Sequence, residues 1–178
     1  MKSIRKFLLG LLVAVATMLT SCGGNEPDMP DVPASDTYQS ATVIYYINLS
    51  NDYYSFYDVK VIYTNGNGEA VQGSITNNQN FAYTIPVTKL PEYIRFALQL
   101  TAKSPLPSVD TDRTFIFSNS SSVDIVGNKN DGTKITRNID TQYLEFEVSP
   151  ENVAAFVSQE PEMLIGPYEY PTVEFKRK

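Results

Sequence analysis

The chain has 178 residues, of which 42% are hydrophobic and 19% are charged, and its formal net charge is −6. The hydrophobic fraction is too high for a disordered protein, and the length suits one domain with an ordinary core. The sequence contains no histidine, no tryptophan and one cysteine. It therefore excludes histidine dyads, an intrachain disulfide and a cysteine-based zinc cluster.

The first 22 residues have the layout of a secretory signal. Lys2, Arg5 and Lys6 precede an apolar run over residues 7–19, and the only cysteine, Cys22, follows shortly after it. The run is shorter than the ~20 residues needed to cross a bilayer, but it suits the apolar core of a signal peptide. The segment Leu19-Thr20-Ser21-Cys22 resembles the lipobox of bacterial lipoproteins. This resemblance implies cleavage after residue 21 and lipidation of Cys22; the alternatives are an ordinary signal peptide and an uncleaved anchor.

A lipidated Cys22 would anchor the chain without spanning the membrane, since each buried CH₂ contributes about 0.8 kcal/mol. Removing residues 1–21 leaves 11 basic and 20 acidic residues, and the resulting charge of −9 opposes binding to nucleic acid. Gly23 stands where lipoproteins retained in the inner membrane often carry Asp, so the resemblance favours the outer membrane. Residues 25–28 match the acid-rich tract of surface-exported lipoproteins only in part, which leaves the periplasmic and external faces both open.

Residues 22–36 are expected to form a flexible tether between the lipid and the domain. They contain Pro27, Pro30 and Pro33 together with four acidic and no basic residues. Such a composition favours extended polyproline II and cannot bury enough apolar surface to fold. At about 3.1 Å per residue, the tether could hold the domain up to roughly 40 Å from the lipid.

From residue 37 to residue 178, alternating apolar and polar residues predict one all-β domain with antiparallel strands. Asn65-Gly66-Asn67-Gly68 and Asn130-Asp131-Gly132 predict hairpin turns, and Ser149-Pro150 predicts the start of one helix, which ends at Glu160-Pro161. Residues 144–148 are expected to bury Leu144, Phe146 and Val148. The expected strands cover residues 42–49, 57–64, 69–75, 81–87, 93–103, 114–117, 121–126, 133–137, 144–148 and 173–175.

The leading fold prediction is a single antiparallel immunoglobulin-like β-sandwich with one short late helix, and the alternative is a lipocalin-like barrel. The lipobox, the acidic tether, the segment over residues 57–68 and Leu90-Pro91 before residues 93–103 resemble small lipoproteins of gut Bacteroidetes. The resemblance implies an immunoglobulin-like sandwich in the cell envelope with a role near glycan uptake or surface adhesion. It offers no catalytic residues.

The clearest candidate for ligand binding is a cluster of aromatic residues. Seven of the twelve tyrosines lie between residues 38 and 63. Residues 51–56 are expected to form a loop between two strands, whose exposed rings could contact sugars or a protein partner. The alternative is that β-sheets are rich in tyrosine anyway and that these rings cap the end of the sandwich. The candidate ligand-binding residues are Tyr53, Tyr54, Phe56 and Tyr57.

The acidic residues offer only weak candidates for metal binding or catalysis. Asp110 and Asp112 could provide two Ca²⁺ ligands, but such a site needs about six oxygens, and a solvated turn in which Arg113 pairs with Asp112 is the simpler interpretation. Residues 128–132 lack the closing Glu of a calcium loop and are interpreted as a hairpin turn. A hydrolase using paired carboxylates would need two of them ~5–10 Å apart. No spacing marks such a pair. Glu145 and Glu147 share one strand face and could lie near each other, but they alternate with expected core residues, which favours a solvated outer face.

These observations predict a non-catalytic protein of the cell envelope, held in the outer membrane by acyl chains such as palmitate on Cys22. Its sandwich would present loops for binding or adhesion. The first alternative is a glycan-binding accessory lipoprotein of a polysaccharide uptake system, and the second is the carboxylate hydrolase. No cofactor is expected, and the partner is expected to be a glycan or a protein.

Overall fold

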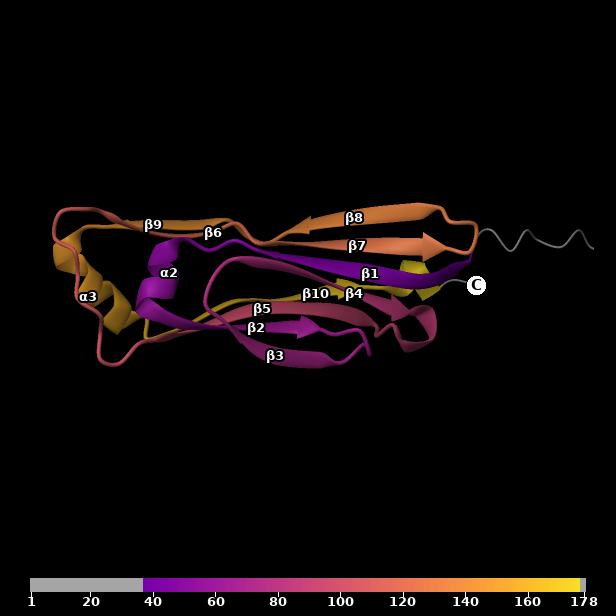
Figure 1. Ribbon diagram of the computed structural model, residues 1–178, viewed down its shortest axis with the longest axis horizontal. Coiled ribbons are helices and arrows are strands. Elements are labelled where there is room, and N and C mark those ends of the chain that lie inside the picture. The colour runs from indigo at the N-terminus through magenta and orange to yellow at the C-terminus, as the bar shows by residue number, and fades with distance from the viewer. Residues whose placement is uncertain (1–36, 177–178) are drawn as a thin grey trace, which may run out of the picture. The chain divides into compact units, whose positions relative to one another are not determined.

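Residues 37–176 are described by a computed structural model, in which antiparallel sheets account for more than half of the described residues (Figure 1). Two short α-helices, α2 (Asn51–Phe56) and α3 (Pro150–Gln159), and two 3-10 helices, η2 (Val87–Lys89) and η3 (Val173–Lys176), connect the strands. The strands are β1 (Tyr38–Ile47), β2 (Tyr57–Thr64), β3 (Ala70–Ile75), β4 (Gln79–Pro86), β5 (Tyr93–Ala102), β6 (Phe115–Asn119), β7 (Ser122–Lys129), β8 (Lys134–Asp140), β9 (Leu144–Val148) and β10 (Glu162–Pro171).

The strands form two main sheets with the orders β4-β1-β7-β8 and β10-β5-β2-β3. A third sheet contains only β6 and β9, and we call it the β6–β9 ribbon. Every strand pairing is antiparallel. The prediction of an all-β sandwich is therefore confirmed, and within residues 37–176 the two main sheets stay separate instead of closing into a barrel. The immunoglobulin-like detail is not confirmed, because β1 and β2 lie in different sheets, whereas the first two strands of an immunoglobulin domain share one.

The predicted hairpins and most predicted strands are present. The β2–β3 pair closes through the Asn65–Glu69 turn, and the β7–β8 pair closes through a turn in which Gly132 has φ +85°. Strand β1 is central, as expected, because β4 pairs with one edge and β7 with the other. Strand β5 buries Ile94, Phe96, Leu98 and Leu100, the face that the alternation predicted.

Tyr45 joins the two main sheets in the middle of the core. Its ring, on β1, is fully buried and stacks on Phe96 of β5, with ring centroids 5.8 Å apart. Its hydroxyl donates to the carbonyl oxygen of Thr64 on β2 and accepts from the Thr64 amide, both at 3.0 Å. Because Thr64 is also buried, this hydroxyl satisfies two backbone groups that water does not reach.

Helix α2 replaces the loop that was expected over residues 51–56. The Asp52 carboxylate, in its first turn, accepts from two guanidinium nitrogens of Arg113 at 3.1 and 2.6 Å and from the Ile116 amide at 2.7 Å. Tyr53 and Phe56 pack against the rings of Phe117 and Phe115, respectively, with centroids 5.3 and 5.4 Å apart. Six residues are too few for a stable isolated helix, so these contacts with β6 stabilise it.

Two expectations for the last third of the chain are wrong. Residues 173–175 belong to the 3-10 helix η3, and the last strand is β10, whose alternation is interrupted by a register shift between Ile165 and Tyr168. Strand β9 is present, but Phe146 is 40% exposed and Leu144 is only half-buried. The expected dry face is incomplete because β9 belongs to the ribbon, which neither main sheet includes.

The bridge between Tyr45 and Thr64 generates a stability prediction. In the Tyr45→Phe variant, the ring remains but the buried amide and carbonyl of Thr64 lose their partner, so we expect the free energy of unfolding to fall by about 3 kcal/mol. Chemical denaturation measures it. The matched control is Tyr83→Phe, which removes a partly exposed hydroxyl bonded to Tyr63 and should cost less than about 1 kcal/mol. Equal losses in the two variants would contradict the prediction.

Candidate functional site

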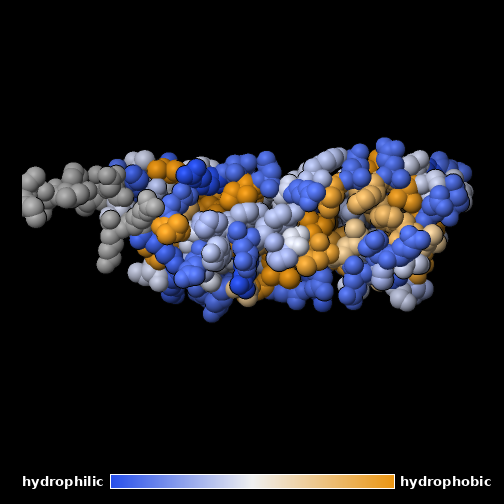
Figure 2. Space-filling model, turned by 180° about the vertical axis from the view of Figure 1, so that it is seen from behind, coloured by the Kyte–Doolittle hydropathy of each residue, from blue (hydrophilic) through white to orange (hydrophobic). Residues whose placement is uncertain are grey.

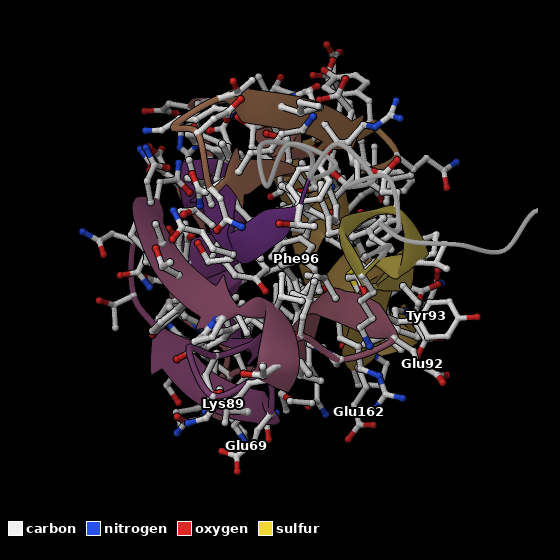
Figure 3. The ribbon with its side chains drawn as sticks, turned by 90° about the vertical axis from the view of Figure 1, so that its right-hand side faces the viewer. Glu69, Lys89, Glu92, Tyr93, Phe96 and Glu162 are labelled. Carbon is white, nitrogen blue, oxygen red and sulfur yellow. The ribbon has the colours of Figure 1, made fainter. Side chains whose placement is uncertain are left out.

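The site begins with Tyr93, the first residue of β5, whose side chain is 46% exposed. Figure 3 views the end of the sandwich where Tyr93 lies and shows its ring pointing outward beside Glu92. Within residues 37–176, this ring stacks on no other aromatic ring. Tyr93 therefore presents a flat, amphipathic surface to solvent.

Buried hydrogen bonds fix the backbone that carries Tyr93. The fully buried Thr172, after the end of β10, donates from its amide to the carbonyl oxygen of Glu92 at 2.9 Å, and its hydroxyl donates to the carbonyl oxygen of Pro91. On the β2 side, the Arg95 amide donates to the Thr64 hydroxyl at 2.9 Å. Tyr93 is thus held between two tied residues, which limits the conformational entropy that binding would remove.

The β2–β3 turn packs closely beside this strand start. The Asn65 side-chain oxygen accepts from the amides of Asn67 and Glu69 at 2.8 and 3.1 Å. Gly68 has φ +80°, and a Cβ at this position would lie 2.1 Å from the carbonyl oxygen of Lys89. Glycine is therefore required both for the left-handed conformation and for the approach to η2.

Two hollows of about 330 and 350 Å³ lie beside Tyr93, and together with it they make up what we call the Tyr93 site. Glu92 and Tyr93 line both of them. The first hollow is completed by Thr64, Gly68, Ala70, Pro91 and Arg95, and the second by Pro171, Thr172, Val173 and Lys176.

The charges around the Tyr93 site are of both signs. The Arg95 guanidinium lies 3.0 Å from the Glu169 carboxylate, and both side chains are about half exposed. Glu92 and Lys176 add one carboxylate and one ammonium group to the lining. A ring with donors and acceptors around it suits a polar ligand without a strong net charge. Among residues 37–176, no group of three or more acidic side chains is placed to hold a metal ion.

A second pair of hollows, of about 240 and 430 Å³, lies between β3 and β4, which are edge strands of the two main sheets. Tyr63 and Tyr83 line both, with their rings stacked at 5.5 Å and their hydroxyls 3.2 Å apart. This hydrogen bond raises the pKa of Tyr63 above its usual value. Since each of these rings stacks on the other, they close the side of the sandwich, and the free ring of Tyr93 is the better candidate for ligand contact.

The aromatic residues that the sequence suggested for ligand binding are not available as an exposed loop. Tyr53, Phe56 and Tyr57 are buried, and Tyr54 is half-buried. Burial raises the pKa of Tyr53, Tyr54 and Tyr57 to about 12 in each case. The hypothesis of a binding loop at these four residues is therefore wrong: Tyr53, Phe56 and Tyr57 belong to the core, and Tyr54 packs against it.

The weak metal candidates form an exposed turn. The Asp110 carboxylate accepts from the Asp112 amide at 3.0 Å and lies 3.8 Å from the Arg113 guanidinium. Arg113 was expected to pair with Asp112, but its closest partner is the buried Asp52, 61 positions away in sequence. Arg113 also lies over the Phe115 ring at 4.0 Å, so it holds α2 and β6 together.

The predicted lipid anchor, Cys22, lies outside the described residues, so its lipidation stays a prediction. No helix within residues 37–176 is long and apolar enough to cross a membrane.

Tyr93 was missed as a site residue, although it occupies a polar-face position of a strongly alternating strand, where a large aromatic ring is a usable signal.

Comparisons with protein-family models, with curated proteins and with solved structures find no match for this chain. The candidate site is therefore supported by its own geometry.

The buried phenols generate a prediction for alkaline pH. Burial raises the pKa of Tyr53, Tyr54, Tyr57 and Tyr170 from 10.0 to about 12. The stability that these neutral phenols contribute is fully present below pH 10 and is lost as the pH rises towards 12. Tyrosinate absorbance should therefore show a late phase near pH 12 that coincides with unfolding. Tyr53→Phe should reduce its amplitude, and a single phase near pH 10 without unfolding would contradict the prediction.

Proposed function

We propose that this chain is a non-catalytic lipoprotein of the bacterial cell envelope, in which the β-sandwich binds a ligand at the Tyr93 site. The anchor is supported by the basic start, the apolar run and Cys22 within residues 1–22. The tether is supported by the three prolines and four acidic residues within residues 22–36. The outer membrane is the proposed location, and either of its faces is compatible with these residues.

The single observation that carries the binding function is the exposed ring of Tyr93 between two hollows. Thr172 fixes the backbone next to Tyr93. The neighbouring side chains supply hydrogen-bond donors and acceptors and carry charges of both signs. A tyrosine ring on a fixed backbone contributes contact area at a low entropic cost, because only two side-chain torsions have to be ordered. Adhesion or capture through this end of the sandwich is therefore the leading candidate.

A second, narrower candidate is a glycan-binding accessory lipoprotein of a polysaccharide uptake system. The observation that favours it is again Tyr93, because sugar rings present C–H faces to an aromatic ring and hydroxyl groups to the surrounding polar residues. Glu92, Arg95 and Lys176 are placed on either side of the ring to make such hydrogen bonds.

The anchor is tested by replacing Cys22. In the Cys22→Ala variant we expect the protein to leave the membrane fraction and to incorporate no radiolabelled palmitate, because no thiol remains to be acylated. Cell fractionation with immunoblotting measures the distribution. A variant that partitions with membranes as the wild type does would contradict the lipoprotein assignment.

The ligand site is tested with Tyr93 and with an exposed tyrosine that lines neither hollow. We expect Tyr93→Ala to weaken binding of a soluble polysaccharide by about tenfold, equivalent to about 1.4 kcal/mol, and Tyr93→Phe to retain most of it. Calorimetry against a panel of neutral polysaccharides supplies the affinities. The matched control is Tyr143→Ala, since Tyr143 is 60% exposed and lines neither hollow. Equal effects of the two alanine variants would reject the Tyr93 site.

A further inference from the structure

The β6–β9 ribbon has a free edge at the end of the domain opposite to Tyr93 (Figure 1). In this two-stranded sheet, β6 lies on the side of α2 and β9 is the outer strand. Within residues 37–176, no strand pairs with the second edge of β9. An unpaired edge of this kind is a template for another strand.

The hydrogen bonds of β6 show which backbone groups of β9 are free. The amides of Ile116 and Ser118 donate to Asp52 and Ser50, away from β9. In an antiparallel pair, the backbone groups of successive residues point to alternate sides of the strand. The backbone groups of Phe115, Phe117 and Asn119 therefore face β9, where these residues pair with Val148, Phe146 and Leu144. The N–H and C=O groups of the intervening Glu145 and Glu147 therefore point outward.

The nearby edge strands carry features that discourage pairing. Strand β8 carries Lys134 and Arg137, and β10 is interrupted by the register shift between Ile165 and Tyr168. Strand β9 (Leu144–Val148) contains no lysine, no proline and no register shift. Its edge is open to a partner that tolerates two glutamates.

The side chains of the ribbon alternate between acidic and apolar. Glu145 and Glu147 are exposed, whereas Phe146 is 40% exposed and packs against Phe156 of α3, with ring centroids 5.8 Å apart. Ile116, which pairs with Glu147, is 43% exposed. Figure 2 shows hydrophobic side chains gathered on the half of the domain that carries α3.

We propose that the free edge of β9 binds an extended segment of another protein in which basic and apolar residues alternate. The segment forms backbone hydrogen bonds with Glu145 and Glu147. Its basic side chains lie opposite the two glutamates, and its apolar side chains extend the surface of Phe146 and Leu144. Main-chain pairing of this kind supplies affinity, and the alternating side chains supply specificity.

Charge favours a different protein over a second copy of this chain. If two β9 strands paired with their apolar faces matched, Glu145 and Glu147 of one copy would lie opposite the same residues of the other. Like charges directly opposite one another destabilise a strand pair. This surface is separate from the Tyr93 site, and the inference does not depend on the proposed function.

Fluorescence anisotropy of the full chain with a labelled peptide of alternating lysine and valine tests the inference. We expect saturable binding, and about tenfold weaker binding of a peptide with the same composition but with lysines and valines in separate blocks. Equal binding of the two peptides would overturn the proposal, because only non-specific attraction to an acidic protein would remain.

Variants identify the edge. The double variant Glu145→Lys with Glu147→Lys should no longer bind the alternating lysine–valine peptide and should bind an alternating glutamate–valine peptide instead. The matched control, Asp58→Lys with Glu69→Lys, makes the same change in net charge at exposed positions on β2 and its turn and should behave as the wild type does. An equal loss in the control variant would overturn the proposal.

A backbone variant separates strand pairing from charge. Glu147→Pro removes one outward N–H but leaves the pairing of Phe146 and Val148 with β6 in place, so binding should weaken while circular dichroism remains unchanged. If this variant instead abolishes a self-association of the wild-type chain seen by sedimentation, the occupant is a second copy and the proposal is wrong. Retention of peptide binding in a folded Glu147→Pro variant would also overturn it.

Discussion

The structure depends on the Tyr45 hydroxyl, which lies in the core between the two main sheets and bonds to both backbone groups of Thr64. A buried phenol that pairs with a buried amide and carbonyl replaces the water that these groups would otherwise need. It also fixes the end of β2. The Thr64 side chain then accepts the Arg95 amide, so the same residue ties the start of β5. The position of Tyr93 follows from this chain of contacts, because the Thr172 bonds to Pro91 and Glu92 fix its other side.

A second polar contact fixes the opposite end of the domain. Asp52 is buried and accepts from Arg113 and from the Ile116 amide. Because the Arg113 guanidinium is about half exposed, this ion pair costs less desolvation free energy than a fully buried pair would. The backbone bond to Ile116 directs the outer amides of β6 towards α2. Because β6 is occupied on that side, the only edge of the ribbon left for a partner within the described residues is that of β9.

The sequence allowed the strands to be predicted well because alternation is a local property. The buried face of β5 and both asparagine–glycine hairpins depend on neighbouring residues alone. Helix α2 could not be predicted in this way, since six residues become helical only through Arg113 and the rings of β6, more than 55 positions later. For the same reason, the sequence left open whether the four aromatic residues at 53–57 lie at an exposed loop tip or cap the end of the sandwich. Strand β10 was missed because its register shift breaks the period of two.

The two surfaces differ in the partner that their chemistry suits. The Tyr93 site offers one ring, mixed charges and shallow hollows, which fit a small polar ligand or part of a polymer. The β9 edge offers backbone groups between two glutamates, which fit an extended basic chain. Tyr38, at the start of β1, lies 5.2 Å from the Phe175 ring of η3, so the chain enters the domain at the Tyr93 end. A partner strand on β9 would therefore bind at the end farthest from the point of entry, where it leaves the Tyr93 site accessible to its own ligand.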